Sequence, residues 1–399
     1  MFQAGLIKYL EVSVTENQAN RSFLPLNHFE NTAIPVECWK TDKHLMNMNE
    51  KAPTDQAEYR HGTTTLRRVA FITNPTAGKG RGRKTARLAR EHLRARGLEL
   101  AEFPAHTPAA VIESARAAGA DPAIDAIVSC GGDGMLSLVL QAQVGSGKPL
   151  GVIPSGTGND HARHYGIPLD PRGAAEVIAA GHWQETDLGL ATFNTPPALN
   201  NTFLGSPAAG QGQRPANNHG SKPDDNPAQT QQRWFSTIAC VGFDQLVNEK
   251  TTEISWPKGS LRYMLALLII ISQFRPYPVR VSIDDRELPY RELSLIAVAN
   301  TSSYGGGTRI APQASTRDGR FAVTALPAMA RRRAIRLLAG LKFGDITGDS
   351  RFIFDTGQRV VVQMGDLTPI ADGEPLGSGQ VTLEVRPRAG LFLVAPPGS

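Results

Sequence analysis

Residues 126–134 read AIVSCGGDG, and residues 150–160 read LGVIPSGTGND. Each stretch is a short apolar run that ends in a glycine-rich turn, which is typical of a buried strand. A helical pattern follows each turn, the first over Leu136–Val144. Strand, glycine turn and helix thus occur twice in succession, which predicts a parallel α/β sheet.

The same alternation extends toward the N-terminus. Val69–Ile72 is a predicted strand, and a glycine-containing loop and a basic helical stretch that ends near Gly97 follow it. Leu98–Phe103 is a second predicted strand, and Ala109–Ala118 is a predicted helix. Connections of this length between parallel strands are expected to be right-handed crossovers.

The pattern changes after Asp187, where strand-like segments dominate and turn residues separate them. This spacing predicts an antiparallel sandwich or barrel with one or two embedded helices. The expected strands are Val279–Ile283, Leu293–Ala299, Phe321–Ala325, Arg359–Met364 and Val381–Val385.

The domain limits follow from these changes of pattern. Residues 1–66 lack a helical or strand period, and we expect a poorly ordered extension there. Residues 67–186 form the predicted α/β domain, and residues 187–399 form the strand-rich domain. Within the latter, residues 194–232 are rich in Asn, Gln, Pro, Gly and Ala, and such a segment buries too little apolar surface to order itself. We therefore expect a disordered insertion.

The totals describe an ordinary globular protein of 399 residues, with 41% hydrophobic and 20% charged residues. A net charge of +5 suits anionic partners but is no signature of nucleic-acid binding. The 3 cysteines include no CxxC pair, which disfavours a disulfide framework or a zinc site and favours the cytoplasm. The longest apolar run lies around Met264–Ile271 and extends loosely to Leu261–Phe274, which is shorter than the roughly 20 residues of a membrane span. We interpret it as a core helix, so any membrane contact is expected to be peripheral.

Three glycine-rich loops carry the predicted chemistry, because each follows a strand of the α/β domain: residues 74–80, 131–135 and 154–160. Loops at the carboxyl ends of parallel strands meet in one crevice. Glycines let backbone N–H groups approach phosphates closely. Asp133 and Asp160 would repel phosphate unless a cation lies between them, so we expect them to organise Mg²⁺ around a nucleotide. Neither a Walker A pattern nor GxGxxG is present.

The segments NPTAGKG (74–80), CGGDGM (130–135) and PLGVIPSGTGNDHAR (149–163) resemble the three signature blocks of the diacylglycerol kinase catalytic superfamily. The resemblance continues through Tyr304-Gly305-Gly306-Gly307 and Asp372-Gly373-Glu374. It covers residues 67 to 397 apart from the insertion.

The resemblance implies a two-domain lipid kinase that uses ATP and Mg²⁺. Its first domain would have a fold akin to those of NAD kinases and phosphofructokinases and would hold ATP. Its second domain would be a mainly antiparallel β-sandwich that supplies a lipid pocket, with the active site between the two. The implied acceptor is a lipid alcohol, diacylglycerol first.

The resemblance also implies roles for single residues. Asp133 belongs to the ATP–Mg²⁺ network together with Asp160. Asp372 is the expected base for the substrate hydroxyl, with Glu374 beside it and with Asp133 as the rival base. Asp318 corresponds to an acidic residue that helps hold a structural Mg²⁺. From the loops and the resemblance together, the expected nucleotide-binding residues are Asn74, Pro75, Gly78, Gly80, Thr107, Gly131, Gly132, Asp133, Gly134, Gly156, Thr157, Asn159 and Asp160.

Four positions depart from the family pattern. Met135 replaces the usual Thr after GGDG, Ser137 and Leu138 occupy the positions of an Asn-Glu pair, and Thr237 stands where relatives often carry Asn. Two alternatives to an active lipid kinase therefore stay open: an NAD kinase, and a catalytically weak or silent nucleotide- or lipid-binding homologue. The expected setting is the cytoplasm at the inner membrane surface, with no nucleic-acid partner; whether the chain is a monomer or a homodimer is open.

Overall fold

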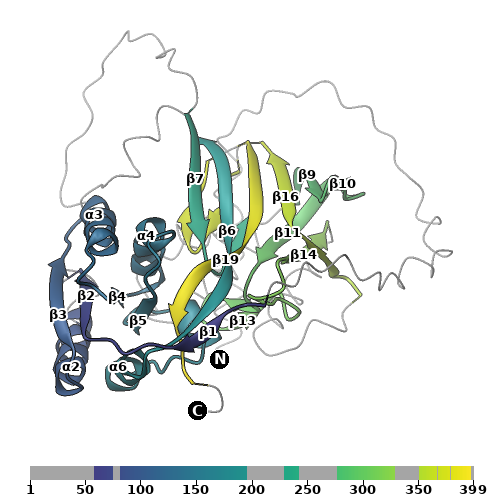
Figure 1. Cartoon of the computed structure of the whole chain (residues 1–399). Coiled ribbons are helices and arrows are strands. Elements are labelled where there is room, and N and C mark those ends of the chain that lie inside the picture. Colours follow the sequence, from purple (N-terminus) through teal and green to yellow (C-terminus); the bar gives the residue numbers. More distant parts are fainter. Residues whose placement is uncertain are drawn as a thin grey trace, which may run out of the picture. The chain divides into compact units, whose positions relative to one another are not determined.

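The structure is a computed structural model that describes residues 58–74, 81–195, 229–241, 276–328, 350–365, 367–377 and 379–396. Figure 1 shows the chain with its helices and strands labelled. Within these described ranges, no helix is both long enough and apolar enough to cross a membrane.

The first half of the fold alternates strands and helices, as the sequence predicts. Its elements are β2 (Arg68–Thr73), α2 (Arg81–Ala95), β3 (Glu99–Pro104), α3 (Pro108–Ala120), β4 (Ala126–Gly131), α4 (Asp133–Gln143), β5 (Leu150–Pro154), α5 (Asp160–His164) and α6 (Pro171–Ala180).

The four strands of this half pair in parallel in the order β3-β2-β4-β5. Helix α2 packs against α6, and α3 packs against α4, as Figure 1 shows. Right-handed crossovers in this strand order put α2 on one face of the sheet and α3 with α4 on the other. The inner strands β2, β4 and β5 are apolar on both faces because both faces are covered, and Phe71, Ile127 and Ile153 are fully buried.

Two strands of 14 residues each run from this half into the second half of the fold: β6 (His182–Thr195) and β19 (Gln380–Leu393). They pair in antiparallel fashion over nearly their whole length, from Val381↔Phe193 to Leu393↔Trp183. The end of β19 also pairs in parallel with β5, at Phe392↔Leu150. The C-terminal end of the chain is therefore part of the α/β sheet, which the sequence pattern did not predict.

The second half is a β-sandwich, one of the two architectures left open by the sequence. Its first sheet has the order β7-β6-β19-β16-β9-β10, and its second has the order β15-β14-β11-β8-β17-β18. The strands not yet located are β7 (Gln229–Phe235), β8 (Ile238–Val241), β9 (Tyr277–Ile283), β10 (Arg286–Glu287), β11 (Glu292–Ala299), β14 (Phe321–Pro327), β15 (Ile353–Gly357), β16 (Arg359–Met364), β17 (Ile370–Ala371) and β18 (Glu374–Pro375). A separate hairpin joins β12 (Ser303–Tyr304) to β13 (Thr308–Arg309).

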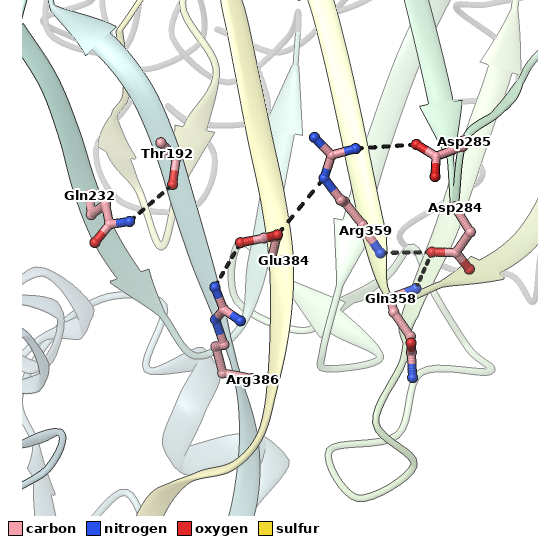
Figure 2. A network of polar contacts seen from close by, with 8 residues as sticks. All are labelled: Thr192, Gln232, Asp284, Asp285, Gln358, Arg359, Glu384 and Arg386. Atoms are coloured by element: carbon pink, nitrogen blue, oxygen red, sulfur yellow. Dashed lines mark hydrogen bonds and ion pairs between the residues drawn. The ribbon is translucent and has the colours of Figure 1, made fainter. Parts of the chain in front are cut away.

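Side chains that alternate along the strands build the core of the sandwich. In β16, Val360 and Val362 are fully buried, whereas Arg359 and Gln363 are exposed. The exposed face carries a polar network across neighbouring strands, in which Arg359 pairs with Asp285 and Glu384 (Figure 2). This alternation of buried and exposed residues is the period-2 pattern of a sheet with one solvated face.

The structure corrects two of the predicted limits. Residues 58–66, expected to belong to a poorly ordered extension, include β1 (His61–Thr63), which pairs with the start of β6. The predicted insertion, residues 194–232, has strand structure at both ends, because β6 extends to Thr195 and β7 begins at Gln229. Both limits were wrong for the same reason. The strands β1 and β7 pair with β6, which lies far away in the sequence, and such pairing leaves no periodic pattern in the local sequence.

Four further predictions fall on residues outside the described ranges. These are the extension at 1–57, the core helix at 261–274, the middle of the insertion at 196–228, and residues 75–80 of the first glycine loop.

Candidate active site

Two of the three predicted glycine loops lie against each other at the carboxyl ends of β4 and β5. The Ser155 N–H donates to the Gly131 carbonyl over 2.8 Å. A Cβ atom added to Gly156 would lie only 2.7 Å from the Cα of Gly132. Glycine at these positions is therefore required by the close approach of two backbones.

Asp133 is the first residue of α4 and joins the two loops. Its carboxylate accepts hydrogen bonds from the Asn159 N–H over 2.7 Å and from the Asp160 N–H over 2.9 Å. Burial, followed by the negative charge of Asp160, raises the pKa of the Asp133 carboxyl to about 6. The charge of Asp372 raises this pKa further, so a carboxylate of the second half of the fold acts on the glycine loops.

Asn159 gives the third loop its shape. Its backbone is left-handed, with φ of 51°. Its side-chain Oδ1 accepts from the Gly156 N–H over 2.9 Å, and its Nδ2 donates to the Gly156 carbonyl over 3.1 Å. Asn tolerates this conformation better than most residues because its side chain hydrogen-bonds locally. The turn thereby directs the N–H groups of residues 159 and 160 at Asp133.

Asp160 connects the glycine loops to the second half of the fold. Its two carboxylate oxygens accept from the N–H groups of Gly305 (2.7 Å) and Gly306 (2.8 Å). Both glycines lie in the β12–β13 turn and have positive φ, which suits glycine. Burial raises the pKa of Asp160, whereas these backbone hydrogen bonds lower it. The Tyr-Gly-Gly-Gly segment noted in the sequence is thus a partner of Asp160.

Asp372 lies in the tight turn between β17 and β18, and its φ is 49°. One carboxylate oxygen accepts from the Ser236 N–H over 2.7 Å and from the Ser236 hydroxyl over 3.2 Å. The other accepts from the Thr237 N–H over 2.9 Å and from the Thr237 hydroxyl. The Asp-Gly pair does form a hairpin turn, and the same turn also carries an oriented carboxylate.

Glu374 follows in the same turn and reaches toward α4. A Cβ atom added to Gly134 would lie 3.2 Å from Glu374 Oε1, so the lack of a side chain at Gly134 leaves room for this carboxylate. Glu374 Oε2 lies 3.7 Å from Nη2 of Arg233. Burial raises the pKa of Glu374, Arg233 lowers it, and the charge of Asp372 raises it.

A cavity of about 200 Å³ adjoins the glycine loops. Three of the residues that line this cavity, Asn74, Gly131 and Gly132, are among the predicted nucleotide-binding residues. Two residues that depart from the family pattern, Met135 and Leu138, line it as well, which makes this part of the site more apolar. Ser137, another residue that departs from the family pattern, is buried, and its hydroxyl oxygen accepts a hydrogen bond from Arg233 Nη2 over 3.4 Å.

The other predicted nucleotide-binding residues have separate positions. The hydroxyl of Thr107 accepts from the Ala110 N–H over 3.2 Å and so caps α3. Thr157 is exposed at the tip of the third loop. Pro75, Gly78 and Gly80 lie outside the described residues.

The predicted metal ligands do not form one cluster. Among the described residues, no group of three or more His, Cys, Asp or Glu side chains is arranged to hold a metal ion. Asp133 and Asp160 lie together, whereas Asp318 lies near Asp187 and accepts from the Arg320 N–H over 3.0 Å. The carboxylates around Asp133 nevertheless fit a hard cation, because their mutual repulsion would fall when an oxygen-preferring Mg²⁺ neutralises them.

Arg233 and Ser236 take part in this site, and the sequence analysis missed both. Arg233 follows directly after the segment that composition marked as disordered, and Ser236 carries no local signal. Thr237 had been noted only as a departure from the family pattern, yet it holds Asp372 through two hydrogen bonds.

Comparison with known proteins agrees with this architecture. Residues 68–191 match the family model described as the diacylglycerol kinase catalytic domain. Residues 237–394 match the model described as the YegS C-terminal NAD kinase beta sandwich-like domain. Both predicted fold classes, α/β and β-sandwich, are thereby confirmed.

Full-length relatives extend the match. The chain is 33% identical over 312 residues to a diacylglycerol kinase of Mycobacterium tuberculosis, which covers 77% of this chain and 88% of that protein. It is 26% identical over 314 residues to a diacylglycerol kinase of Bacillus subtilis, covering 77% of this chain and 90% of that one.

The fold itself is shared with a solved structure. A crystal structure of a diacylglycerol kinase from Bacillus anthracis superposes with a TM-score of 0.60 at 17% sequence identity, covering 84% of this chain and 99% of that one. The resemblance of the three glycine-rich segments is confirmed, and the chain belongs to the diacylglycerol kinase family.

Proposed function

We propose that this protein is an ATP-dependent lipid kinase that transfers the γ-phosphate of ATP to a lipid hydroxyl, with diacylglycerol as the acceptor and phosphatidic acid as the product. One observation carries the proposal: the Asp372-Gly373-Glu374 segment of the sandwich lies against the glycine loop that carries Asp133, since a Cβ atom added to Gly134 would lie 3.2 Å from Glu374 Oε1. A phosphate donor and an acceptor must meet at such a junction.

The glycine loops supply the donor side. Gly131 and Gly132 line the cavity beside the loops without side chains, and the N-terminus of α4 adds a favourable dipole for phosphate. Bound Mg²⁺ would neutralise charge on the nucleotide oxygens. Asp133, with Asp160 beside it, would hold that ion, and the two backbone N–H donors fix the direction of the Asp133 carboxylate.

The turn at Asp372 supplies the acceptor side. Phosphoryl transfer breaks the bond between the γ-phosphorus and the bridging oxygen of ADP and forms a bond to the lipid oxygen, whose proton must leave. The four hydrogen bonds to Asp372 orient its carboxylate and occupy both acceptor sites of each oxygen. Rotation of the Ser236 or Thr237 hydroxyl would free one of these sites to accept the proton of the lipid hydroxyl. Asp133 is the rival base, because a pKa of about 6 is closer to neutral pH.

The lipid identity of the acceptor rests on the family, whose members in Mycobacterium tuberculosis and Bacillus subtilis are named diacylglycerol kinases. The test is an assay with labelled ATP and Mg²⁺ against a mixed lipid extract, followed by identification of the labelled product. We expect label in phosphatidic acid, and no product from NAD. Formation of NADP at a comparable rate would assign the protein to the NAD kinases, and no transfer at all would support a silent binding protein.

Substitution of Asp372 separates the two candidate bases. Asp372→Asn keeps the size of the side chain but loses the hydrogen bond from one of the two backbone N–H groups, so a melting curve must first show that the variant is folded. In the folded variant, Mg-ATP affinity should stay within about 3-fold of wild type. Lipid phosphorylation should fall by about 100-fold or more, as when a general base is lost. A variant that phosphorylates diacylglycerol at the normal rate would leave Asp133 as the base and Asp372 as a plain turn residue.

A bilayer-embedded acceptor also implies where the enzyme works. We propose that the protein is cytoplasmic and contacts the inner membrane surface peripherally, with residues 67–186 binding ATP and residues 187–399 binding lipid. Co-sedimentation with vesicles that contain diacylglycerol, compared with vesicles that lack it, tests the membrane contact. Sedimentation velocity on the same preparation decides between a monomer and a homodimer.

A further inference from the structure

Arg233 is held rigidly at the junction of the two halves. It lies on β7, and the next residue, Trp234, is clamped to α4 by two hydrogen bonds with Gln141: Gln141 Nε2 donates to the Trp234 carbonyl over 2.8 Å, and the Trp234 N–H donates to Gln141 Oε1 over 2.9 Å. Helix α4 begins with Asp133. The backbone beside Arg233 is therefore tied to the helix that begins at a glycine loop, and the Arg233 guanidinium reaches Ser137 on that helix.

The hydrogen-bonding capacity of this guanidinium is largely unused. Its side chain is only 15% exposed. Nη2 makes two long contacts, 3.7 Å to Glu374 Oε2 and 3.4 Å to Ser137 Oγ. Nε is buried and has no hydrogen-bond partner among the described residues. A guanidinium offers five N–H donors, and a buried charge without partners is costly. This pattern indicates that a ligand completes the contacts.

The charge of the site indicates what kind of ligand. Asp133, Asp160, Asp372 and Glu374 bring four carboxylates to one junction. Arg233 is the cation that acts on Glu374, and it lowers the pKa of that carboxyl. A guanidinium fork matches the oxygens of a phosphoryl group, to which it donates two parallel hydrogen bonds.

Building on the proposed function, we propose that Arg233 is a catalytic residue that donates hydrogen bonds to the oxygens of the phosphoryl group during its transfer. The bond between the γ-phosphorus and ADP breaks, the bond to the lipid oxygen forms, and the hydroxyl proton passes to the carboxylate base. Arg233 stays protonated throughout and stabilises the charge on the transferring group. Ser137 and Glu374 keep the guanidinium in place between turnovers.

The alternative role for Arg233 is that of a structural partner for Glu374. The two roles differ in what they predict for nucleotide binding without lipid. A residue that contacts the γ-phosphate favours ATP over ADP, whereas a residue that only holds Glu374 affects both nucleotides equally.

Titration of Mg-ATP and Mg-ADP into the lipid-free protein therefore provides the first test. In Arg233→Met, the affinity for Mg-ATP should fall by about 10-fold, whereas the affinity for Mg-ADP should stay within about 3-fold. Glu374→Gln should retain the wild-type preference for ATP. Equal loss of both nucleotides in Arg233→Met, or the same loss in Glu374→Gln, would overturn the proposal.

Turnover of diacylglycerol is the second test. Loss of a guanidinium that contacts a transferring phosphoryl group costs on the order of 10³-fold in rate, so kcat should fall by about that factor in Arg233→Met with little change in KM for lipid. Arg233→Lys keeps the charge without the fork and should recover part of the rate. Added guanidinium ion should also restore part of the activity to Arg233→Ala, whose short side chain leaves room for the ion, which a purely structural role does not predict.

Arg359→Met is the matched control, because Arg359 pairs with Asp285 and Glu384 on the exposed face of the sandwich (Figure 2). It should leave kcat unchanged. A kcat within about 3-fold of wild type in Arg233→Met would overturn the catalytic role. A wild type that binds Mg-ATP but phosphorylates no lipid contradicts the proposed function alone, and the comparison of ATP with ADP then still decides the role of Arg233.

Discussion

Two acidic groups in this fold, the half-buried Asp133 and the fully buried Asp187, differ in the hydrogen bonds that they accept. Asp133 lies beside other carboxylates, Asp160 and Asp372, and accepts only two backbone hydrogen bonds. Asp187 is fully buried at the start of the sandwich and accepts three hydrogen bonds: from the Tyr59 hydroxyl (2.5 Å), the Gly319 N–H (2.7 Å) and the Arg388 N–H (3.1 Å).

The difference shows how one fold keeps some acidic groups for stability and others for chemistry. Donors from three separate segments satisfy Asp187, so its contacts stabilise the packing of β6 against its neighbours. The charges of Asp160 and Asp372 raise the pKa of Asp133, so a bound cation would relieve the repulsion among these carboxylates. Substitutions in the two groups should consequently separate turnover from stability.

The largest expected effect is on turnover in Asp133→Asn. The substitution keeps the size of the side chain but removes the charge that would organise Mg²⁺. We expect kcat to fall by on the order of 10³-fold or more, as when a metal-organising charge is lost in phosphoryl transfer. The melting temperature should not fall below that of wild type, because the substitution removes a charge that burial and the charge of Asp160 disfavour. The measurement is the initial rate of lipid phosphorylation at saturating Mg-ATP, and a near-normal rate would contradict the role of Asp133.

The opposite result is expected for Asp187→Asn. An amide cannot accept all three hydrogen bonds that the carboxylate accepts, so a buried donor loses its partner. The free energy of unfolding should fall by about 2–4 kcal/mol. Urea denaturation measures this loss. The kcat of the folded protein should stay close to wild type, and a selective loss of turnover would mean that the two groups are not independent.

The pH dependence of stability sharpens the comparison. Folding raises the pKa of Asp133 from 3.8 to about 6, so the folded state binds the proton more tightly than the unfolded state. The wild type therefore loses stability relative to Asp133→Asn as the pH rises from 4 toward 7, by up to about 3 kcal/mol. Urea denaturation of both proteins in the presence of EDTA, at several pH values, measures this difference. A difference that does not vary with pH would show that Asp133 is not destabilised in the metal-free protein.

The smallest expected effect is that of Tyr59→Phe, which removes one of the three donors to Asp187 and leaves the ring in place. We expect a loss of about 1 kcal/mol in the free energy of unfolding, because the two backbone donors remain. The same denaturation experiment measures it. A loss as large as that of Asp187→Asn would show that the tyrosine hydroxyl is the dominant partner.

Much of the first half of the fold was predictable from the sequence, since it depends on local patterns. Short apolar runs before glycine turns predicted β2, β4 and β5 to within one or two residues. The same reasoning predicted that Asp133 and Asp160 would lie in one place, because the carboxyl ends of adjacent parallel strands share an edge. The bonds from the Asn159 and Asp160 N–H groups to Asp133 agree with that expectation.

The parts that were missed depend on contacts between distant segments. No local period shows that β19 returns to pair with β5, or that residues 58–63 pair with β6 and supply Tyr59 to Asp187. Arg233 was missed because it follows a segment of low complexity and because the residues that it contacts, Ser137 and Glu374, lie far away in the sequence.

By itself, the sequence determined the strand–glycine–helix alternation, the two fold classes and the family, since glycine turns and apolar periods are local properties of the chain. Only the tertiary structure decided which backbone and side-chain donors form hydrogen bonds with each acidic group. That distinction depends on donors from distant segments: the N–H groups of Ser236 and Thr237 for Asp372, and those of Gly305 and Gly306 for Asp160. The physical reason is that desolvation and charge repulsion depend on distance in space, and folding alone sets those distances.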